Sequence, residues 1–410
     1  MLTRREAAQI LLAAAATAAA GTPALAADKT VKIGADLSLT GADSQGASRV
    51  RNALIMAFDA ANEGNAIPGY KFELMTLDDG TATAGQYDPA QAATNARKMV
   101  SDKDVVASIG PQMSGAGKAM TPILSQGGLA TITPSSTNPD ITSPKFAEQY
   151  RPAGKPIYFR TVTTDAYQGP NMANFFAETL KVKSVYILDD SGAFGVGVAD
   201  SFQKQAEAKG VKIAGRDRLD PKAADYTAIL TKIKSMNVDS IYYGGVSQAG
   251  VKLAKQAYDI VPTVIKGGPD GVTSADFLSG AGFPAVEGWY TSIAAPHLVE
   301  DTKAAQFVEA FKGKFGDAPD DYTITAYDAA LVIIDAVKRL VAAGKPVTRE
   351  TVRDSIQTAK VPTIQGIVSF DANGDLADRT VSVFQIKKDT TKPLNDVSAQ
   401  YKYITVAPQS

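Results

Sequence analysis

Residues 107–117 combine residue types and spacing that suit the binding of a small anion. An apolar stretch from Val105 to Ile109 ends at Gly110-Pro111, and Ser114 stands at the expected N-cap of a helix that continues through Lys118 to Gln126. The first N–H groups of such a helix lack backbone partners and carry the positive end of the helix dipole, which favours a carboxylate. Taken alone, these residues leave a second interpretation open, in which Ser114 only caps its helix.

Few other residues suit catalysis. The chain contains no cysteine and one histidine, His297, and a lone histidine is more often structural than catalytic. The glycine-rich stretches at 112–119, 192–197 and 245–249 each miss a required position of the phosphate-binding loop, the dinucleotide-binding loop or the nucleophile elbow. We therefore expect a protein that is not an enzyme and has no cofactor.

One group of oxygen-bearing side chains has a spacing that suggests calcium. However, Ser382 stands where the glutamate of a calcium loop belongs, and a tight Asn-Gly turn between two strands explains the same residues. We prefer the turn and expect no metal at these residues, which are Asp371, Asn373, Asp375 and Asp378.

Charge and the N-terminal sequence restrict the partners and the location. With 42 basic and 43 acidic residues, the chain offers no electrostatic reason to bind nucleic acid or an anionic membrane. Arg4-Arg5, the apolar segment from Ile10 to Ala20 and an A-x-A site at Ala24-Leu25-Ala26 predict a signal peptide over residues 1–26 and a periplasmic protein. The arginine pair leaves twin-arginine export open beside the general secretory route.

The elements that must position these residues alternate between strands and helices. We expect helices at 47–62, 302–315 and 322–343, and seams at 140–156 and 292–301 where the chain could cross between domains. A chain of 410 residues favours two domains, and the alternation predicts parallel sheets flanked by helices. The expected strands are 31–39, 71–78, 105–110, 129–133, 156–162, 184–189, 240–245, 263–267, 366–370, 380–387 and 401–406.

Four of these strands end in polar, glycine-rich segments, at 111–115, 133–137, 244–247 and 267–271. Ligands of open parallel sheets bind beyond the carboxyl ends of strands, and two of these ends come from each half of the chain, so we expect a cleft between two lobes. Ser114 and residues Ser135, Ser136 and Thr137 would donate to a carboxylate, and Asp270 would pair with a ligand ammonium. Pro-Asp-Gly is also a good turn sequence, so a purely structural role for Asp270 stays open.

Five motifs in order resemble the periplasmic leucine/isoleucine/valine-binding protein family. They read SIGPQMSGAG at 108–117, ITPSSTNPDIT at 132–142, YYGG at 242–245, GPDGV at 268–272 and FDANGDL at 370–376. The resemblance implies a type I periplasmic-binding-protein fold, in which two α/β lobes are joined by three hinge crossings. The lobes are expected to comprise 28–165 with 293–378, and 166–292 with 379–410.

The same resemblance implies roles for individual residues. The carboxylate-binding serine of the family falls on Ser114, its main-chain ligand on Ser135, its amino-group threonine on Thr137 and its acidic residue on Asp270, which is one carbon shorter than the usual glutamate. Other positions lie around the cleft or replace an aromatic residue that the family often has there, which leaves the side-chain preference open. These positions are Gln45, Val246, Phe194, Tyr167 and Tyr327.

The function that the resemblance implies is that of a solute receptor of a branched-chain amino-acid ABC transporter. The expected partners are a small amino acid and an inner-membrane permease with its ATPase, and the expected state is a monomer. Two alternatives stay open: the same scaffold could bind an aromatic acid, a dicarboxylate or a short amide, or it could report its ligand to a signalling receptor.

Overall fold

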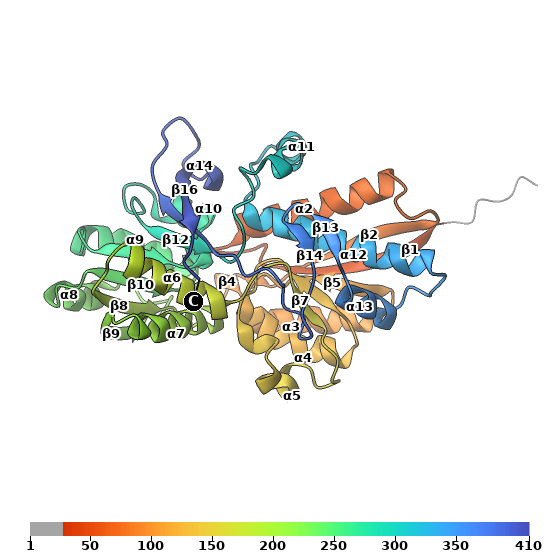
Figure 1. Cartoon of the computed structure of the whole chain (residues 1–410), viewed down its shortest axis with the longest axis horizontal. Coiled ribbons are helices and arrows are strands. Elements are labelled where there is room, and N and C mark those ends of the chain that lie inside the picture. The colour runs from red at the N-terminus through yellow and green to blue at the C-terminus, as the bar shows by residue number, and fades with distance from the viewer. Residues whose placement is uncertain (1–27, 410) are drawn as a thin grey trace, which may run out of the picture.

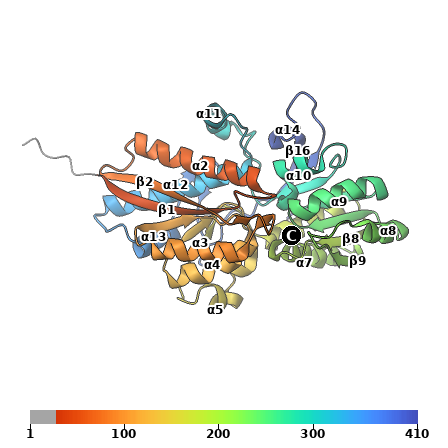
Figure 2. The ribbon, with the colours of Figure 1, turned by 180° about the vertical axis from the view of Figure 1, so that it is seen from behind.

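The computed structural model describes residues 28–409 and contains two α/β lobes that lie side by side (Figures 1 and 2). The predicted signal peptide therefore lies outside the described residues. Segments from the C-terminal third of the chain occur in both lobes (Figure 1), so each lobe is built from separate parts of the sequence. None of the helices within residues 28–409 combines the length and the apolar character that a membrane span requires.

The first lobe contains a five-stranded parallel sheet in the order β2-β1-β5-β6-β7. Alternate side chains of β1, among them Val31 and Ile33, are buried in the same apolar cluster as side chains of α2 (Ser44–Glu63), α12 (Asp321–Ala342) and α13 (Arg349–Gln357). Side chains of α3 (Pro89–Ser101) and α4 (Ser114–Gln126), among them Met99 and Met120, belong to a second apolar cluster of this lobe. The strands are β1 (Lys29–Leu37), β2 (Tyr70–Asp78), β5 (Val105–Ile109), β6 (Thr131–Thr133) and β7 (Tyr158–Arg160).

The helices of the first lobe follow the amphipathic segments of the sequence. In α2, the buried residues Val50, Leu54, Ala57 and Phe58 recur at three- and four-residue spacing, as predicted. The helices are α2 (Ser44–Glu63), α3 (Pro89–Ser101), α4 (Ser114–Gln126), α5 (Ala147–Tyr150), α11 (Ala305–Phe315), α12 (Asp321–Ala342) and α13 (Arg349–Gln357). Two hairpins, β3 (Gly80–Thr81) with β4 (Gln86–Tyr87) and β13 (Val361–Thr363) with β14 (Gly366–Val368), complete the strands outside the two main sheets.

The second lobe contains a seven-stranded sheet in the order β16-β15-β12-β11-β10-β8-β9. Strands β8 to β12 pair in parallel, while β15 and β16 are added in antiparallel fashion at one side. The strands are β8 (Ser184–Asp189), β9 (Lys212–Arg218), β10 (Ser240–Gly244), β11 (Ile265–Gly268), β12 (Tyr290–Ile293), β15 (Ser382–Ile386) and β16 (Tyr401–Val406).

Two apolar clusters hold the helices of the second lobe against its sheet. One contains side chains of α8, α9 and α10, and the other contains side chains of α6 and α7. The helices are α6 (Asp165–Asn174), continued by a π-helical turn at Phe175–Thr179, α7 (Ala193–Ala208), α8 (Thr227–Ser235), α9 (Ser247–Ile260), α10 (Ala275–Ala281) and α14 (Val397–Gln400). Short 3₁₀ turns occur at Pro139–Ile141, Pro144–Phe146, Asp270–Val272 and Thr302–Ala304.

The chain passes between the lobes three times: after β7, after β12 and before β15. The first two passages lie side by side, because the Thr163 N–H donates to the Ala294 carbonyl at 2.8 Å. The third joins them where the Ser382 hydroxyl donates to the Ala295 carbonyl at 2.9 Å. The predicted fold class with three crossings is confirmed, while the residue bounds of the lobes stay a prediction.

One predicted seam is wrong. Residues 140–156 connect β6 to β7, which are neighbouring strands of the same sheet, so the chain does not leave the first lobe there. The broken periodicity has a local cause: Asn138 and Ser143 each cap a 3₁₀ turn that begins with a proline, at Pro139 and Pro144. The seam at 292–301 does coincide with a passage between the lobes.

Candidate functional site

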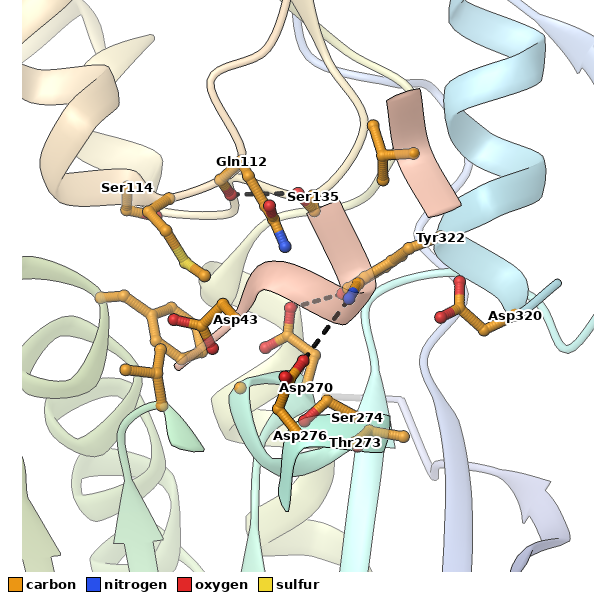
Figure 3. Close-up of a pocket in the computed structure, with 16 residues that line it drawn as sticks. Asp43, Gln112, Ser114, Ser135, Asp270, Thr273, Ser274, Asp276, Asp320 and Tyr322 are labelled. Atoms are coloured by element: carbon orange, nitrogen blue, oxygen red, sulfur yellow. Dashed lines mark hydrogen bonds between the residues drawn. The ribbon is translucent and has the colours of Figure 1, made fainter. Parts of the chain in front are cut away.

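A cavity between the lobes is lined by helix starts and loops of both lobes (Figure 3). Ser114 and Ser135 lie on its upper side in Figure 3, and Asp270 and Asp276 lie on its lower side. The lining residues are Asp43, Gly46, Val50, Gln112, Met113, Ser114, Ser135, Phe194, Val246, Asp270, Gly271, Thr273, Ser274, Asp276, Asp320 and Tyr322.

The upper wall is the start of α4, where β5 turns directly into a helix. The helix begins earlier than predicted, so Met113 is its N-cap residue and Ser114 its first residue. The interpretation that Ser114 only caps the helix is therefore wrong. Its hydroxyl instead accepts hydrogen bonds from the Asn138 N–H at 3.2 Å and from the Ser136 hydroxyl at 3.3 Å. These bonds fix Ser114 beside the free N–H groups at the helix start.

The loop after β6 carries Ser135, and hydrogen bonds from a buried arginine fix this loop in place. Arg160, at the end of β7, donates to the carbonyls of Ser136 and Asn138 and forms an ion pair with Asp375 at 2.8 Å. The Ser135 hydroxyl donates to the Gln112 carbonyl at 3.0 Å, which ties the loop to the segment before α4. The two polar segments of the first lobe thus form one rigid wall.

The lower wall belongs to the second lobe, where Asp270 follows β11. Asp270 is buried, its Oδ2 accepts a hydrogen bond from the Tyr322 hydroxyl on α12, and its Oδ1 has no hydrogen-bond partner among residues 28–409. Burial raises the pKa of Asp270 to about 6, although the bond from Tyr322 lowers it. At pH 7 the site therefore holds a buried carboxylate with one oxygen available for a cation.

Three further aspartates line the cavity and were missed in the sequence; Asp320 caps α12, and the other two are Asp43 and Asp276. Asp43 immediately precedes α2, and burial, followed by the charges of Asp276 and Asp190, raises its pKa to about 8. Asp276 lies in the first turn of α10 and accepts a hydrogen bond from the Gly46 N–H at 3.4 Å, across the gap between the lobes. An aspartate next to a helix start is normally interpreted as a cap, so nothing in the sequence marked either residue.

Of the ten residues named in the sequence, five line the cavity together: Ser114, Ser135, Phe194, Val246 and Asp270. Two more lie directly behind its upper wall. Ser136 is buried and bonded to Ser114, and the Thr137 carbonyl accepts the Asp165 N–H at 3.0 Å. Ser136 and Thr137 are both buried and neither is among the lining residues, and the Thr137 hydroxyl has no hydrogen-bond partner among residues 28–409.

The other three residues do not line the cavity. Gln45 precedes the lining residue Gly46, but its side chain accepts a hydrogen bond from Asn395 at 3.5 Å. Tyr167 packs on the core of α6 and α7, with Arg379 over its ring at 4.7 Å. The ring of Tyr327 packs against Phe307 at 4.8 Å, because the face of α12 that carries it is turned into the first-lobe core.

The comparison with known sequences decides the family. A family profile described as "Periplasmic binding protein" matches residues 30–391. The chain belongs to the periplasmic binding protein family. The predicted recognition and the predicted kind of function, solute binding, are confirmed at this level, and membership of this family assigns the protein to the outside of the cytoplasm.

Relatives in the family are similar over almost their whole length. The chain is 31% identical to the leucine-, isoleucine-, valine-, threonine- and alanine-binding protein of Pseudomonas aeruginosa, over 93% of this chain and 96% of the relative. It is 30% identical to a Leu/Ile/Val-binding protein of Rhizobium johnstonii, over 87% of this chain and 91% of the relative. Its structure resembles a leucine-binding protein of Thermotoga maritima with a TM-score of 0.78 and 26% identity, covering 92% of this chain and 98% of that one.

Tyr322 is a further polar residue in the cavity of this periplasmic binding protein that the sequence did not reveal. It lies in the first turn of α12, whose N-cap is Asp320, and reaches from the first lobe to Asp270 in the second. The sequence contained one usable signal: α12 follows the passage at 292–301, so its first turn had to start near the hinge. The Ala294 N–H, within that passage, donates to the Tyr322 hydroxyl at 3.3 Å.

Proposed function

We propose that this protein is an extracytoplasmic receptor that captures a small amino acid between its lobes and delivers it to an ABC permease. The main support for this proposal is that the two walls of the cavity differ in charge. One wall has the start of α4 with Ser114 and Ser135, and the other has the buried Asp270. A free amino acid has a carboxylate and an ammonium close together, and these two walls offer donors to the first and a negative charge to the second.

Aliphatic amino acids are the first candidates for the ligand. Phe194 and Val246 form an apolar cluster with Val198 and the partly buried Met113, and Val50 lies in the lining as well. Such a surface suits a small apolar side chain. The names of the relatives, which bind leucine, isoleucine and valine, support the same class of ligand.

The proposed mechanism is closure of the lobes around the ligand. Hydrogen bonds already join the two sides of the cleft, from the Asn138 side-chain amide to the Ala193 carbonyl at 2.9 Å and from the Gln248 side-chain amide to the Ala84 carbonyl at 2.8 Å. A ligand that contacts both walls favours the closed state, because the open state offers only one set of these contacts. The permease would then receive the closed, loaded form.

We also propose that the protein binds its ligand without chemical turnover. His297 does not line the cavity, and both of its ring nitrogens face carboxylates, Asp321 at 2.9 Å and Glu300 at 3.3 Å. Acid–base catalysis by histidine needs the imidazole within reach of the substrate, and His297 lacks that reach. We further propose that the protein is a monomer and that its signal peptide is removed near Ala26.

Isothermal titration calorimetry of the mature protein with individual L-amino acids tests this function. We expect binding of at least one small aliphatic amino acid with one site per chain, and a rise in the unfolding temperature on its addition. The Asp270→Ala variant serves as the matched control, since its cavity keeps the upper wall and loses the negative charge. Absence of heat and of thermal shift with every amino acid would overturn the proposal.

A further inference from the structure

Asp43 occupies a helix N-cap position without capping the helix. An aspartate at this position normally accepts a hydrogen bond from the second or third N–H of the helix, as Asp88 does for α3 with the Ala90 N–H at 2.8 Å. The Asp43 side chain makes no such bond to α2. It lines the cavity instead, is 6% exposed as a residue, and its Oδ2 has no hydrogen-bond partner among residues 28–409.

The start of α2 does not depend on Asp43 for a hydrogen-bond acceptor, because Asp276 of the other lobe provides one. The Gly46 N–H, the third of α2, donates to the Asp276 carboxylate. This arrangement satisfies a helix N–H group that would otherwise lack a partner, and it leaves the Asp43 carboxyl in the cavity with an oxygen to offer.

The charged side chains that line the cavity together with Asp43 are all acidic. The cavity is lined by four aspartates, and its lining, which lies entirely within the described chain, includes no lysine, arginine or histidine. Arg49, further along α2, is itself paired with Asp317 at 2.8 Å and Asp320 at 3.5 Å. Burial among these groups, with Asp276 and Asp190 nearby, raises the pKa of Asp43 to about 8, so the carboxyl is mainly protonated at pH 7.

A purely apolar ligand side chain fits this end of the cavity poorly. Closure over a methyl or isobutyl group would exclude water from the Asp43 carboxyl and leave its oxygen unpaired, which costs free energy. At pH 7 the protonated Asp43 carboxyl has one acceptor oxygen and one O–H, so a ligand hydroxyl or amide, which both donates and accepts, would pair with it, and an ammonium group would pair with it after release of the proton. Phe194 and Val246 would then contact the carbon atoms of the same side chain.

We propose that Asp43 determines specificity by selecting, among small amino acids, those whose side chain carries a hydrogen-bond donor. The inference rests on the proposed function, because it concerns the same cavity, and it places small amino acids with a polar side chain ahead of purely aliphatic ones. The donor can be neutral, as in threonine or asparagine, or cationic, as in ornithine. Both share the chemistry that the unpaired Asp43 oxygen requires.

Pairs of amino acids with matching shape test this selection by calorimetry. Threonine and valine differ in one hydroxyl, and asparagine and leucine have similar outlines, so size stays nearly constant within each pair. We expect the wild-type protein to bind the polar member of at least one pair about tenfold more tightly, which is what one buried hydrogen bond typically provides. Equal or weaker binding of the polar member in both pairs overturns the proposal.

Variants at position 43 separate selection from folding. In Asp43→Leu the preference should reverse in favour of the apolar member, while Asp43→Asn, which keeps an acceptor, should retain part of it. Thermal unfolding checks that both variants fold. Asp88→Asn is the matched control at a helix N-cap outside the cavity, and its ligand preference should equal that of the wild type. A polar preference that persists in Asp43→Leu also overturns the proposal.

Calorimetry with ornithine tests whether the preferred donor on the ligand is cationic or neutral. Binding of a cation beside a protonated Asp43 would release a proton, which calorimetry detects as a dependence of the binding heat on the ionisation enthalpy of the buffer. A neutral donor would bind without this dependence. If no amino acid binds at all, the proposed function fails together with this inference, whereas tight binding of valine and leucine without a polar preference contradicts only the inference.

Discussion

The Asp276 carboxylate in α10 accepts a hydrogen bond from the Gly46 N–H in α2, and this bond joins the two lobes. It also satisfies the start of a first-lobe helix from the second lobe. Opening the cleft would break the bond and expose both groups to water. The Asp276 carboxylate can therefore cap α2 only while the lobes are closed.

Replacement of Asp276 should weaken ligand binding without changing selectivity. In Asp276→Ala the closed state loses one hydrogen bond, so we expect affinity to fall about fivefold for every ligand by the same factor. Asp276→Asn keeps an acceptor for the Gly46 N–H and should lose less. Calorimetry with two different amino acids checks both statements. A loss confined to one ligand would show that Asp276 contacts the ligand directly.

Replacement of Asp270 should remove the partner of the ligand ammonium. We expect Asp270→Ala to weaken amino-acid binding by about 2–5 kcal/mol, as when one member of a buried charge pair is removed. Tyr322→Phe removes only the hydroxyl that donates to Asp270 and should have a smaller effect. Titration with an amino acid and with the same acid lacking its amino group gives the measurement. Unchanged affinity in Asp270→Ala would favour a ligand without an ammonium group.

The pKa of Asp43, which burial raises to about 8, makes the unliganded protein less stable as pH rises. An unfolded aspartate has a pKa of about 3.9, so between pH 4 and pH 8 the folded state binds one proton more than the unfolded state at this residue. The stabilisation from the protonated form is present below pH 4 and is lost as pH rises toward 8. Between pH 6 and pH 8 the expected loss is about 2 kcal/mol.

Chemical denaturation of the wild type and of Asp43→Asn at pH 6 and pH 8 measures this loss. Burial also raises the pKa of Asp270 and of Asp276, each to about 6, and their effect falls mainly below the chosen window. The Asp43→Asn variant should therefore lose less stability over the window than the wild type. Equal losses in the two proteins would show that Asp43 titrates normally.

Arg160 should be required for a stable upper wall. Its guanidinium is fully buried and holds the Ser135 loop through the carbonyls of Ser136 and Asn138. We expect Arg160→Met to lower the free energy of unfolding by about 3 kcal/mol and to weaken binding of every amino acid. Arg151→Met is the matched control, because Arg151 contacts Asn373 of the same turn from a less buried position. Urea denaturation of both variants gives the comparison.

The sequence predicted the arrangement of the cavity best where local pattern and sheet topology agree. Ser114, Ser135 and Asp270 each follow a short buried strand, and the carboxyl ends of parallel strands meet at one edge of a sheet. Tyr167 and Tyr327 were less predictable. Which face of a helix packs inward depends on neighbours from elsewhere in the chain, and both rings are turned into a core.

Asp43 shows why the remaining part of the site could not be predicted. Its sequence context, directly before an amphipathic helix, favours a capping role. Whether it caps depends on Asp276, which is 230 residues further along the chain from Gly46 and reaches α2 only when the lobes are together. No local pattern contains that information, so the residue that we propose as the selector had the sequence signature of an ordinary cap.

The three passages between the lobes also restrict the order in which this protein can fold. The first-lobe core includes Val368 and Leu376, and the second sheet is complete only with β16, which ends at Val406. An N-terminal fragment cannot finish either hydrophobic core, so both lobes must wait for nearly the whole polypeptide. The two lobes therefore complete their cores together, close to the end of the chain, and not one after the other.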